Sequence, residues 1–291
     1  HMSPMSQREI IGAPCVPFTT DMDRLLAERD QFQPVTTPEL FARLWLGSMP
    51  GLISGQSPDR NIFYSSYLST YVERDVRELS GSVDALKFNR FVTAVASYLQ
   101  VFYHQVAARC SQLLNYKALA DDADIDMPTA KNWVNILETL GIIFLLHPYS
   151  NNVLKRTIKT PKVYFYDTGL VCYLTRWSSP EVAESGAMSG ALLENFTVSE
   201  IMKSYQNAGL EPYLYFYRDR DAKEIDVILE GDGKLCPLEI KKTATPDKRL
   251  TRVFSVMDRS PLQLGTGAVL CMAEQFGAFD RDNLIVPIWM I

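Results

Sequence analysis

The sequence has few of the groups that most often build metal or redox centres. Its three histidines lie far apart, and its five cysteines are scattered with no CxxC pair. This spacing argues against a zinc framework or a disulfide-stapled fold, and we expect reduced thiols in a cytoplasmic protein. The sequence contains no run of about 18 apolar residues and no signal peptide, so we expect no membrane span and no membrane partner.

A phosphate-binding motif of the type G-x-x-x-x-G-K-[ST] is also missing. The segment Gly231-Asp232-Gly233-Lys234 has the composition of a hairpin turn, and no Walker B strand accompanies it. We therefore expect that this chain does not bind ATP. The net charge of −5 argues against non-specific nucleic-acid binding by the whole surface, but it is compatible with a local basic patch.

The first third of the chain carries mainly helical patterns. Residues 3–60 are rich in Pro and Gly, and we expect them to be irregular or weakly helical. Residues 61–79 place apolar side chains at three- and four-residue spacing, which predicts a helix. A helix or helix pair is predicted over 84–114.

The segment from 116 to 167 has the element order of a winged helix-turn-helix. A short helix over 116–122 precedes a second helix, for which Asp126 is the predicted N-cap. Gly141 is expected to stop that helix. A strand at 142–146, a basic loop and a second strand at 163–167 complete the pattern.

This segment carries the candidate DNA contacts. In a winged helix, the second helix enters the major groove and the loop touches phosphates. The candidates are Thr129, Lys131 and Asn132 on the helix, with Lys155, Arg156, Lys159 and Lys162 in the loop. The acidic run from 121 to 126 counts against a DNA backbone nearby. Many winged helices dock on proteins instead, so both alternatives stay open.

The remainder of the chain is predicted to be an α/β module. An amphipathic helix over 190–206 comes before three strand patterns, at 213–219, 225–229 and 235–241. A helix over 246–258 and two strand patterns at 267–273 and 284–291 follow. We therefore expect a mixed sheet of about five strands.

A hairpin within this module gathers charged residues. Asp232-Gly233 is a strong signal for a two-residue turn. That turn sets Asp226 opposite Glu239 and Glu224 opposite Lys241, with all four side chains on one face of the sheet.

Two opposed carboxylates suit a divalent cation, because Mg²⁺ is typically held by one or two carboxylates and water. A metal there would polarise a phosphate, and Lys241 would stabilise developing charge, which is the chemistry of phosphodiester hydrolysis. The alternative is structural: Glu224 and Lys241 form an ordinary cross-strand ion pair, and the other two carboxylates are tolerated in water.

The same residues resemble the motif of the PD-(D/E)XK nuclease fold. Asp226 stands in the second strand, Glu239-Ile240-Lys241 in the third, and Glu194 in the preceding helix. The resemblance implies that Glu194, Asp226 and Glu239 ligate Mg²⁺ and that Lys241 positions water or phosphate. Glu224 would be an auxiliary acid.

A wider resemblance covers residues 38–291. Four stretches carry it, together with 237–241: YLSTYVERDV (67–76), PKVYFYDTGL (161–170), GALLENFTVSEI (190–201) and FYRDRDAKEIDVILE (216–230). They are similar to a prokaryotic family in which a domain of unknown function follows an AAA-type P-loop ATPase. The ATPase core is absent here, and His1-Met2 indicates a tag remnant. ATP would bind only to the missing N-terminal domain, and that core would be one partner of this chain.

These observations predict an α+β chain with three consecutive domains. Residues 1–80 would be a helical lid or linker, 81–175 a winged helix-turn-helix, and 176–291 a restriction-endonuclease-like domain. The predicted function is the C-terminal, DNA-associated part of an ATPase, with an Mg²⁺-dependent nuclease-like site. The alternative is a non-catalytic module that binds DNA or another protein and has a degenerate nuclease fold.

Overall fold

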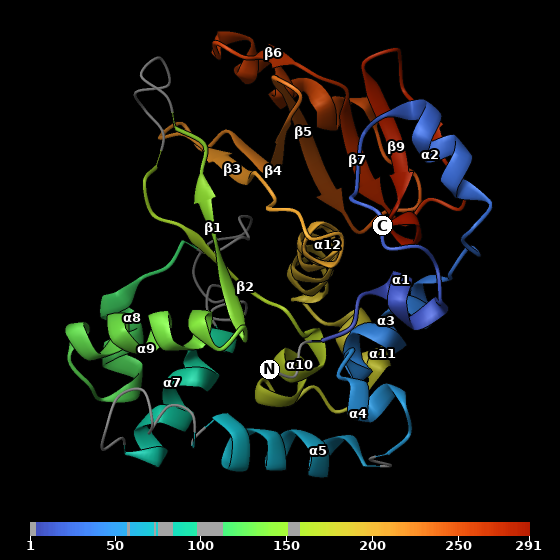
Figure 1. Ribbon diagram of the computed structural model, residues 1–291. Coiled ribbons are helices and arrows are strands. Elements are labelled where there is room, and N and C mark those ends of the chain that lie inside the picture. Colours follow the sequence, from blue (N-terminus) through green and yellow to red (C-terminus); the bar gives the residue numbers. More distant parts are fainter. Residues whose placement is uncertain (1–3, 57–58, 73, 75–83, 98–112, 151–157) are drawn as a thin grey trace. The chain divides into compact units, whose positions relative to one another are not determined.

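The structure is a computed structural model, which describes the chain except for residues 1–3, 57–58, 73, 75–83, 98–112 and 151–157 (Figure 1). The chain divides into two compact units whose segments alternate along the sequence. Unit 1 comprises residues 1–5, 41–145 and 163–192, and unit 2 comprises residues 6–40, 146–162 and 193–291. The division into three consecutive domains stays a prediction.

Residues 3–60, expected to be irregular or weakly helical, contain more helix than their composition suggested. Local capping explains two of these helices: the Ser6 side chain accepts a hydrogen bond from the Glu9 amide, and Asp21 accepts one from the Arg24 amide. The helices are α1 (Gln7–Ile11), α2 (Met22–Arg29), α3 (Thr37–Leu46) and α4 (Pro50–Ile53).

The two helices predicted after residue 60 are present in the described residues. The first begins as α5 (Arg60–Ser66) and continues as a π-helical turn, η1 (Tyr67–Val72). The second is α7 (Ala85–Ser97). The rest of both predictions, over 75–79 and 98–112, lies outside the described residues. No helix in the described part of the chain is long and apolar enough to cross a membrane.

The two helices predicted between residues 116 and 140 are present as α8 (Tyr116–Ala123) and α9 (Met127–Thr139). Asp126 caps α9 by accepting a hydrogen bond from the Thr129 amide at 2.8 Å. Gly141 follows the helix with a φ of 66°, which glycine adopts more readily than other residues.

Two strands follow this segment, as predicted: β1 (Ile143–Pro148) and β2 (Lys162–Phe165). The apolar face of α9 packs on α7, where Trp133 makes edge-on ring contacts with Phe88 and Phe91.

Unit 1 also holds α10 (Thr168–Leu174) and α11 (Pro180–Ser185). The buried carboxylate of Asp167 caps α10 by accepting a hydrogen bond from the Leu170 amide at 2.6 Å. It also accepts hydrogen bonds from the Tyr64 hydroxyl at 2.6 Å and the Ser48 amide at 2.7 Å. Asp167 therefore ties α5 and the turn before α4 to the start of α10.

The five strands predicted after residue 213 are all present, but the mixed sheet has nine strands among the described residues, not about five. Its order is β2-β1-β3-β4-β5-β7-β9-β8, with β6 paired to β5. The predicted strands are β3 (Leu214–Arg218), β4 (Glu224–Gly231), β5 (Lys234–Lys241), β7 (Gly267–Cys271) and β9 (Asn283–Pro287). The additional ones are β1 and β2 and the two-residue strands β6 (Gln263–Leu264) and β8 (Gly277–Ala278).

The connectivity of the sheet changes at β5. β3, β4 and β5 form an antiparallel meander, whereas β7 pairs parallel to β5 and β9 parallel to β7. The helix predicted over 246–258 lies between β5 and β7 as the 3-10 helix η2 (Lys248–Arg259). Its Phe254 and Met257 share a buried cluster with Ile225, Ile228 and Leu235, so η2 covers one face of the meander. A short 3-10 turn, η3 (Ile288–Met290), ends the described chain.

The helix predicted over 190–206 is α12 (Ser189–Asn207), but the expectation that it is amphipathic is wrong for its first half. Every residue from 191 to 200 is buried. The buried polar side chains need partners. The Glu200 carboxylate, for example, pairs with Lys203 at 2.8 Å and accepts a hydrogen bond from the Gln7 amide at 2.7 Å.

Candidate acidic centre in unit 2

The predicted hairpin turn is confirmed. Asp232 and Gly233 both have positive φ, 51° and 71°, as a two-residue turn of the primed type requires. The register pairs Gly231 with Lys234 and continues in step to Val227 opposite Leu238. This register directs Asp226 toward the segment that carries Glu239 and Lys241.

Asp226, Glu239 and Lys241 lie together, as the sequence predicted. The Lys241 ammonium is 2.6 Å from Glu239 Oε1 and 3.6 Å from Asp226 Oδ2. Asp226 Oδ2 also accepts a hydrogen bond from the Ile240 amide at 2.8 Å, which joins the carboxylate to the neighbouring strand. The side chains of Asp226 and Glu239 are 9% and 11% exposed, whereas the Lys241 side chain is 41% exposed.

Burial changes the ionisation of this trio. Burial, with the neighbouring Asp226 carboxylate, raises the pKa of Glu239 to about 8, although Lys241 partly opposes that shift. Burial lowers the pKa of Lys241, but Asp226 and Glu239 raise it by more, so its net pKa is raised. The raised pKa of Glu239 favours its protonated form, and Lys241 is the cation in contact with both acids.

A second lysine, Lys162, completes the cluster. Its side chain is 1% exposed, and its ammonium lies 2.7 Å from Glu224 Oε1 and 3.5 Å from Glu194 Oε1. It also lies 4.9 Å from the centre of the Phe216 ring. Burial lowers the pKa of Lys162, but Glu194, Glu224 and Asp226 raise it by more, so the net pKa is raised. The ammonium stays charged because carboxylates surround it.

Glu224 thus has other partners than the predicted Lys241. Its ion pairs are with Lys162 and, at 3.5 Å, with Arg218, the residue opposite it on β3. In this cluster, four carboxylates therefore share three cationic side chains. We call these seven residues together the acidic centre. Its members are Glu194, Glu224, Asp226 and Glu239, with Lys162, Arg218 and Lys241.

The structure does not group Glu194, Asp226 and Glu239, the predicted Mg²⁺ ligands, as a metal site among the described residues. Among the described residues, no group of three or more His, Cys, Asp or Glu side chains is arranged to hold a metal ion. Carboxylate oxygens are the donors that Mg²⁺ prefers. Here, however, Lys162 pairs with Glu194, and Lys241 pairs with Asp226 and Glu239. The donor chemistry suits Mg²⁺, but the arrangement does not.

The prediction that Lys162 lies in a basic loop is wrong. Lys162 begins β2, and all four residues of that strand are buried. Two signals were available in the sequence. A lysine directly before the apolar run Val163–Phe165 needs an internal partner if the strand is buried, and the hairpin carried more acids than cations.

Most of the other predicted DNA contacts that the structure describes are exposed. Lys131 and Asn132 are exposed near the start of α9, Thr129 is half-buried, and Lys159 is exposed. Lys155 and Arg156 lie outside the described residues. The four neighbouring acids are all exposed: Asp121, Asp122, Asp124 and Asp126. Of these acids, Asp124 pairs with Lys87 at 3.0 Å, so helices α8 and α9 expose three further aspartates beside Lys117 and Lys131.

Two domain models match the chain in succession. Residues 37–181 match a domain of unknown function (DUF8612), and residues 189–291 match another domain of unknown function (DUF4143). The prediction that the chain contains a domain of unknown function is therefore confirmed, and there are two. The association with an ATPase stays a prediction.

Two similar proteins come from mycobacteria. They are the uncharacterized protein Mb2031c of Mycobacterium bovis and the uncharacterized protein Rv2008c of Mycobacterium tuberculosis. Each is 28% identical to this chain over 249 residues, which cover 84% of this chain and 52% of the relative. The chain thus spans about half the length of these relatives. No solved structure gives a significant match.

Proposed function

We propose that residues 189–291 have a nuclease-like fold that follows a winged helix-turn-helix. The order α12-β3-β4-β5-η2-β7, with an antiparallel meander joined to a parallel strand, supports this assignment. Glu194 on α12, Asp226 on β4 and Glu239 with Lys241 on β5 occupy the positions of the motif.

The domain acts as a non-catalytic module, and the observation that carries this conclusion is the position of Lys162. Its buried ammonium lies within 3.5 Å of both Glu194 and Glu224, and Lys241 holds the other two carboxylates. Cationic side chains thus supply the charge that a metal would bring to a nuclease. The acidic centre then stabilises the fold and does not hydrolyse phosphodiesters.

The module belongs to a larger ATPase in this proposal. The support is the resemblance of four separate stretches to a family with an AAA-type core, together with the half of each relative that this chain does not cover. The half of each relative that this chain does not cover is where the AAA-type core would lie. The chain would then be the arm through which the ATPase docks on its partner.

The described surface favours a protein partner over DNA. Four exposed aspartates flank the exposed start of α9, and Lys162 is not available to phosphates. Phosphate neutralisation by Lys and Arg supplies most of the affinity of non-specific DNA binding. An acidic surface repels the DNA backbone and is complementary to a basic protein surface.

A DNA-binding measurement tests this choice of partner. We expect a fluorescent duplex of about 20 base pairs to show no affinity tighter than about 10 μM in fluorescence anisotropy near 0.1 M salt. Lys131→Ala/Asn132→Ala serves as the matched variant, because these exposed residues would lead a recognition helix. Submicromolar, salt-dependent binding that the variant loses would contradict the proposal and favour DNA docking.

One observation favours a second candidate function, Mg²⁺-dependent phosphodiester hydrolysis. Glu239 Oε2 is buried and has no hydrogen-bond partner in the described structure. An unpaired buried oxygen costs about 1–3 kcal/mol, and a bound cation would remove that cost. Asp226 and Glu239 would be the protein ligands for such a metal. Saturable binding of Mn²⁺ at this pair would favour this function.

A further inference from the structure

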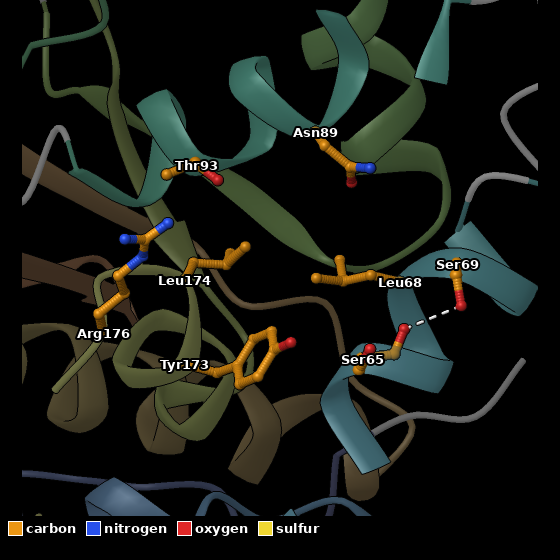
Figure 2. Close-up of a pocket in the computed structure, with 8 residues that line it drawn as sticks. All are labelled: Ser65, Leu68, Ser69, Asn89, Thr93, Tyr173, Leu174 and Arg176. Carbon is orange, nitrogen blue, oxygen red and sulfur yellow. Dashed lines mark hydrogen bonds between the residues drawn. The ribbon is translucent and has the colours of Figure 1, made fainter. Parts of the chain in front are cut away.

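Unit 1 contains a pocket that the acidic centre does not involve. It has a volume of about 390 Å³ and lies among α5, η1, α7 and the end of α10 (Figure 2). Small-molecule sites typically have volumes of about 300–1,000 Å³. Its lining residues are Ser65, Leu68, Ser69, Asn89, Thr93, Tyr173, Leu174 and Arg176.

The chemistry of the lining selects one class of ligand. Four of these side chains carry hydroxyl groups and a fifth carries an amide, so most of the polar lining can both donate and accept hydrogen bonds. Among the described residues that line the pocket, Arg176 supplies the one charged side chain, and none is Asp or Glu. A guanidinium recognises phosphate and carboxylate groups by paired hydrogen bonds. Hydroxyls and an amide suit a polar, hydroxylated body.

Two irregular backbone segments form opposite sides of the pocket. Arg176 has a φ of 60°, which a non-glycine residue rarely adopts, and it directly follows Thr175, the C-cap of α10. Ser69 lies in the π-helical turn η1, where its hydroxyl donates to the Ser65 carbonyl at 3.0 Å. In Figure 2, Arg176 lies on one side of the pocket, and Ser65 and Ser69 lie on the opposite side. Such irregularities are frequent at functional sites.

We propose that this pocket binds a small hydroxylated molecule that carries a phosphate or carboxylate group. Arg176 holds the acidic group, and the hydroxyl groups of Thr93, Tyr173 and Ser69 bind the body of the ligand. The site is independent of the proposed docking function, because none of its residues belongs to the acidic centre or to α9.

Calorimetric titration of the full chain tests the proposal with four probes: ribose 5-phosphate, gluconate, inorganic phosphate and ribose. We expect saturable binding of ribose 5-phosphate or gluconate, and none of neutral ribose. Comparing the two acids tells whether the acidic group is a phosphate or a carboxylate. Inorganic phosphate shows how much of the affinity the acidic group supplies by itself.

Variants identify the pocket as the site. Arg176→Gln should weaken binding at least tenfold, as expected for the loss of a charge-assisted hydrogen bond. Thr93→Val keeps the shape of the side chain and should weaken binding severalfold. Arg90→Gln is the control, because Arg90 is an exposed residue of α7 that does not line the pocket. The proposal is overturned if no probe binds saturably below about 10 mM, or if Arg176→Gln binds as tightly as Arg90→Gln.

Discussion

Replacing Lys162 by methionine should lower the free energy of unfolding by about 3–5 kcal/mol at neutral pH. Methionine keeps most of the length of the side chain but removes the ammonium, which leaves Glu194 and Glu224 buried without their shared cation. Removing one partner of a buried ion pair is costly because the remaining charge cannot be solvated. Denaturant unfolding of the variant and the wild type measures the loss.

Lys159→Met is the matched control, since Lys159 is exposed and lies only three residues earlier. A surface substitution of this kind usually changes stability by less than about 0.5 kcal/mol. If the Lys162 variant were as stable as the Lys159 variant, Lys162 would not be the counter-ion of the acidic centre, and the proposed non-catalytic function would lose its main support.

Glu239 should make the stability of the chain fall as the pH rises toward alkaline values. Its pKa is raised from 4.5 in the unfolded chain to about 8 in the folded one. The folded state therefore binds a proton that the unfolded state releases between these values. The stabilisation is fully present below pH 4.5 and is lost as the pH rises through about 8.

Glu239→Gln removes this titration while keeping the shape of the side chain. The variant should show a flatter stability profile between about pH 6 and 9, and it should be at least about 2 kcal/mol more stable than the wild type at the alkaline end. Glu230→Gln, a less buried position on β4, should leave the slope unchanged. Equal slopes for the wild type and the Glu239 variant, measured by urea unfolding, would show that Glu239 is ionised in the folded state.

Local signals in the sequence were enough to predict the hairpin. Asp232-Gly233 specifies a two-residue turn, and the alternation of a strand then places Asp226 near Glu239 and Lys241 without further information. The same holds for α8 and α9, where Asp126 and Gly141 mark the boundaries of a helix. In these cases, neighbours in sequence decide the structure.

Features that depend on distant segments were not predictable in this way. Lys162 forms ion pairs with Glu194 and Glu224, which lie more than 30 residues away in the sequence. The sequence pattern of β2 does not indicate these partners. The polar residues of α12 suggested an exposed face, but other parts of unit 2 bury them and supply their partners. β6 and β8 are two residues long and carry no pattern that a sequence can reveal.

The central claim is that lysines, and not a metal ion, balance the acidic centre. Calorimetric titration of Mn²⁺ and Mg²⁺ into the full chain tests it most directly, with Asp226→Ala/Glu239→Ala as the variant that lacks both carboxylates nearest Lys241. We predict no saturable heat up to about 10 mM of either ion for the intact chain, which corresponds to an affinity weaker than about 3 kcal/mol. Saturable binding near one ion per chain that the double variant abolishes would contradict the claim and establish a metal centre at Asp226 and Glu239.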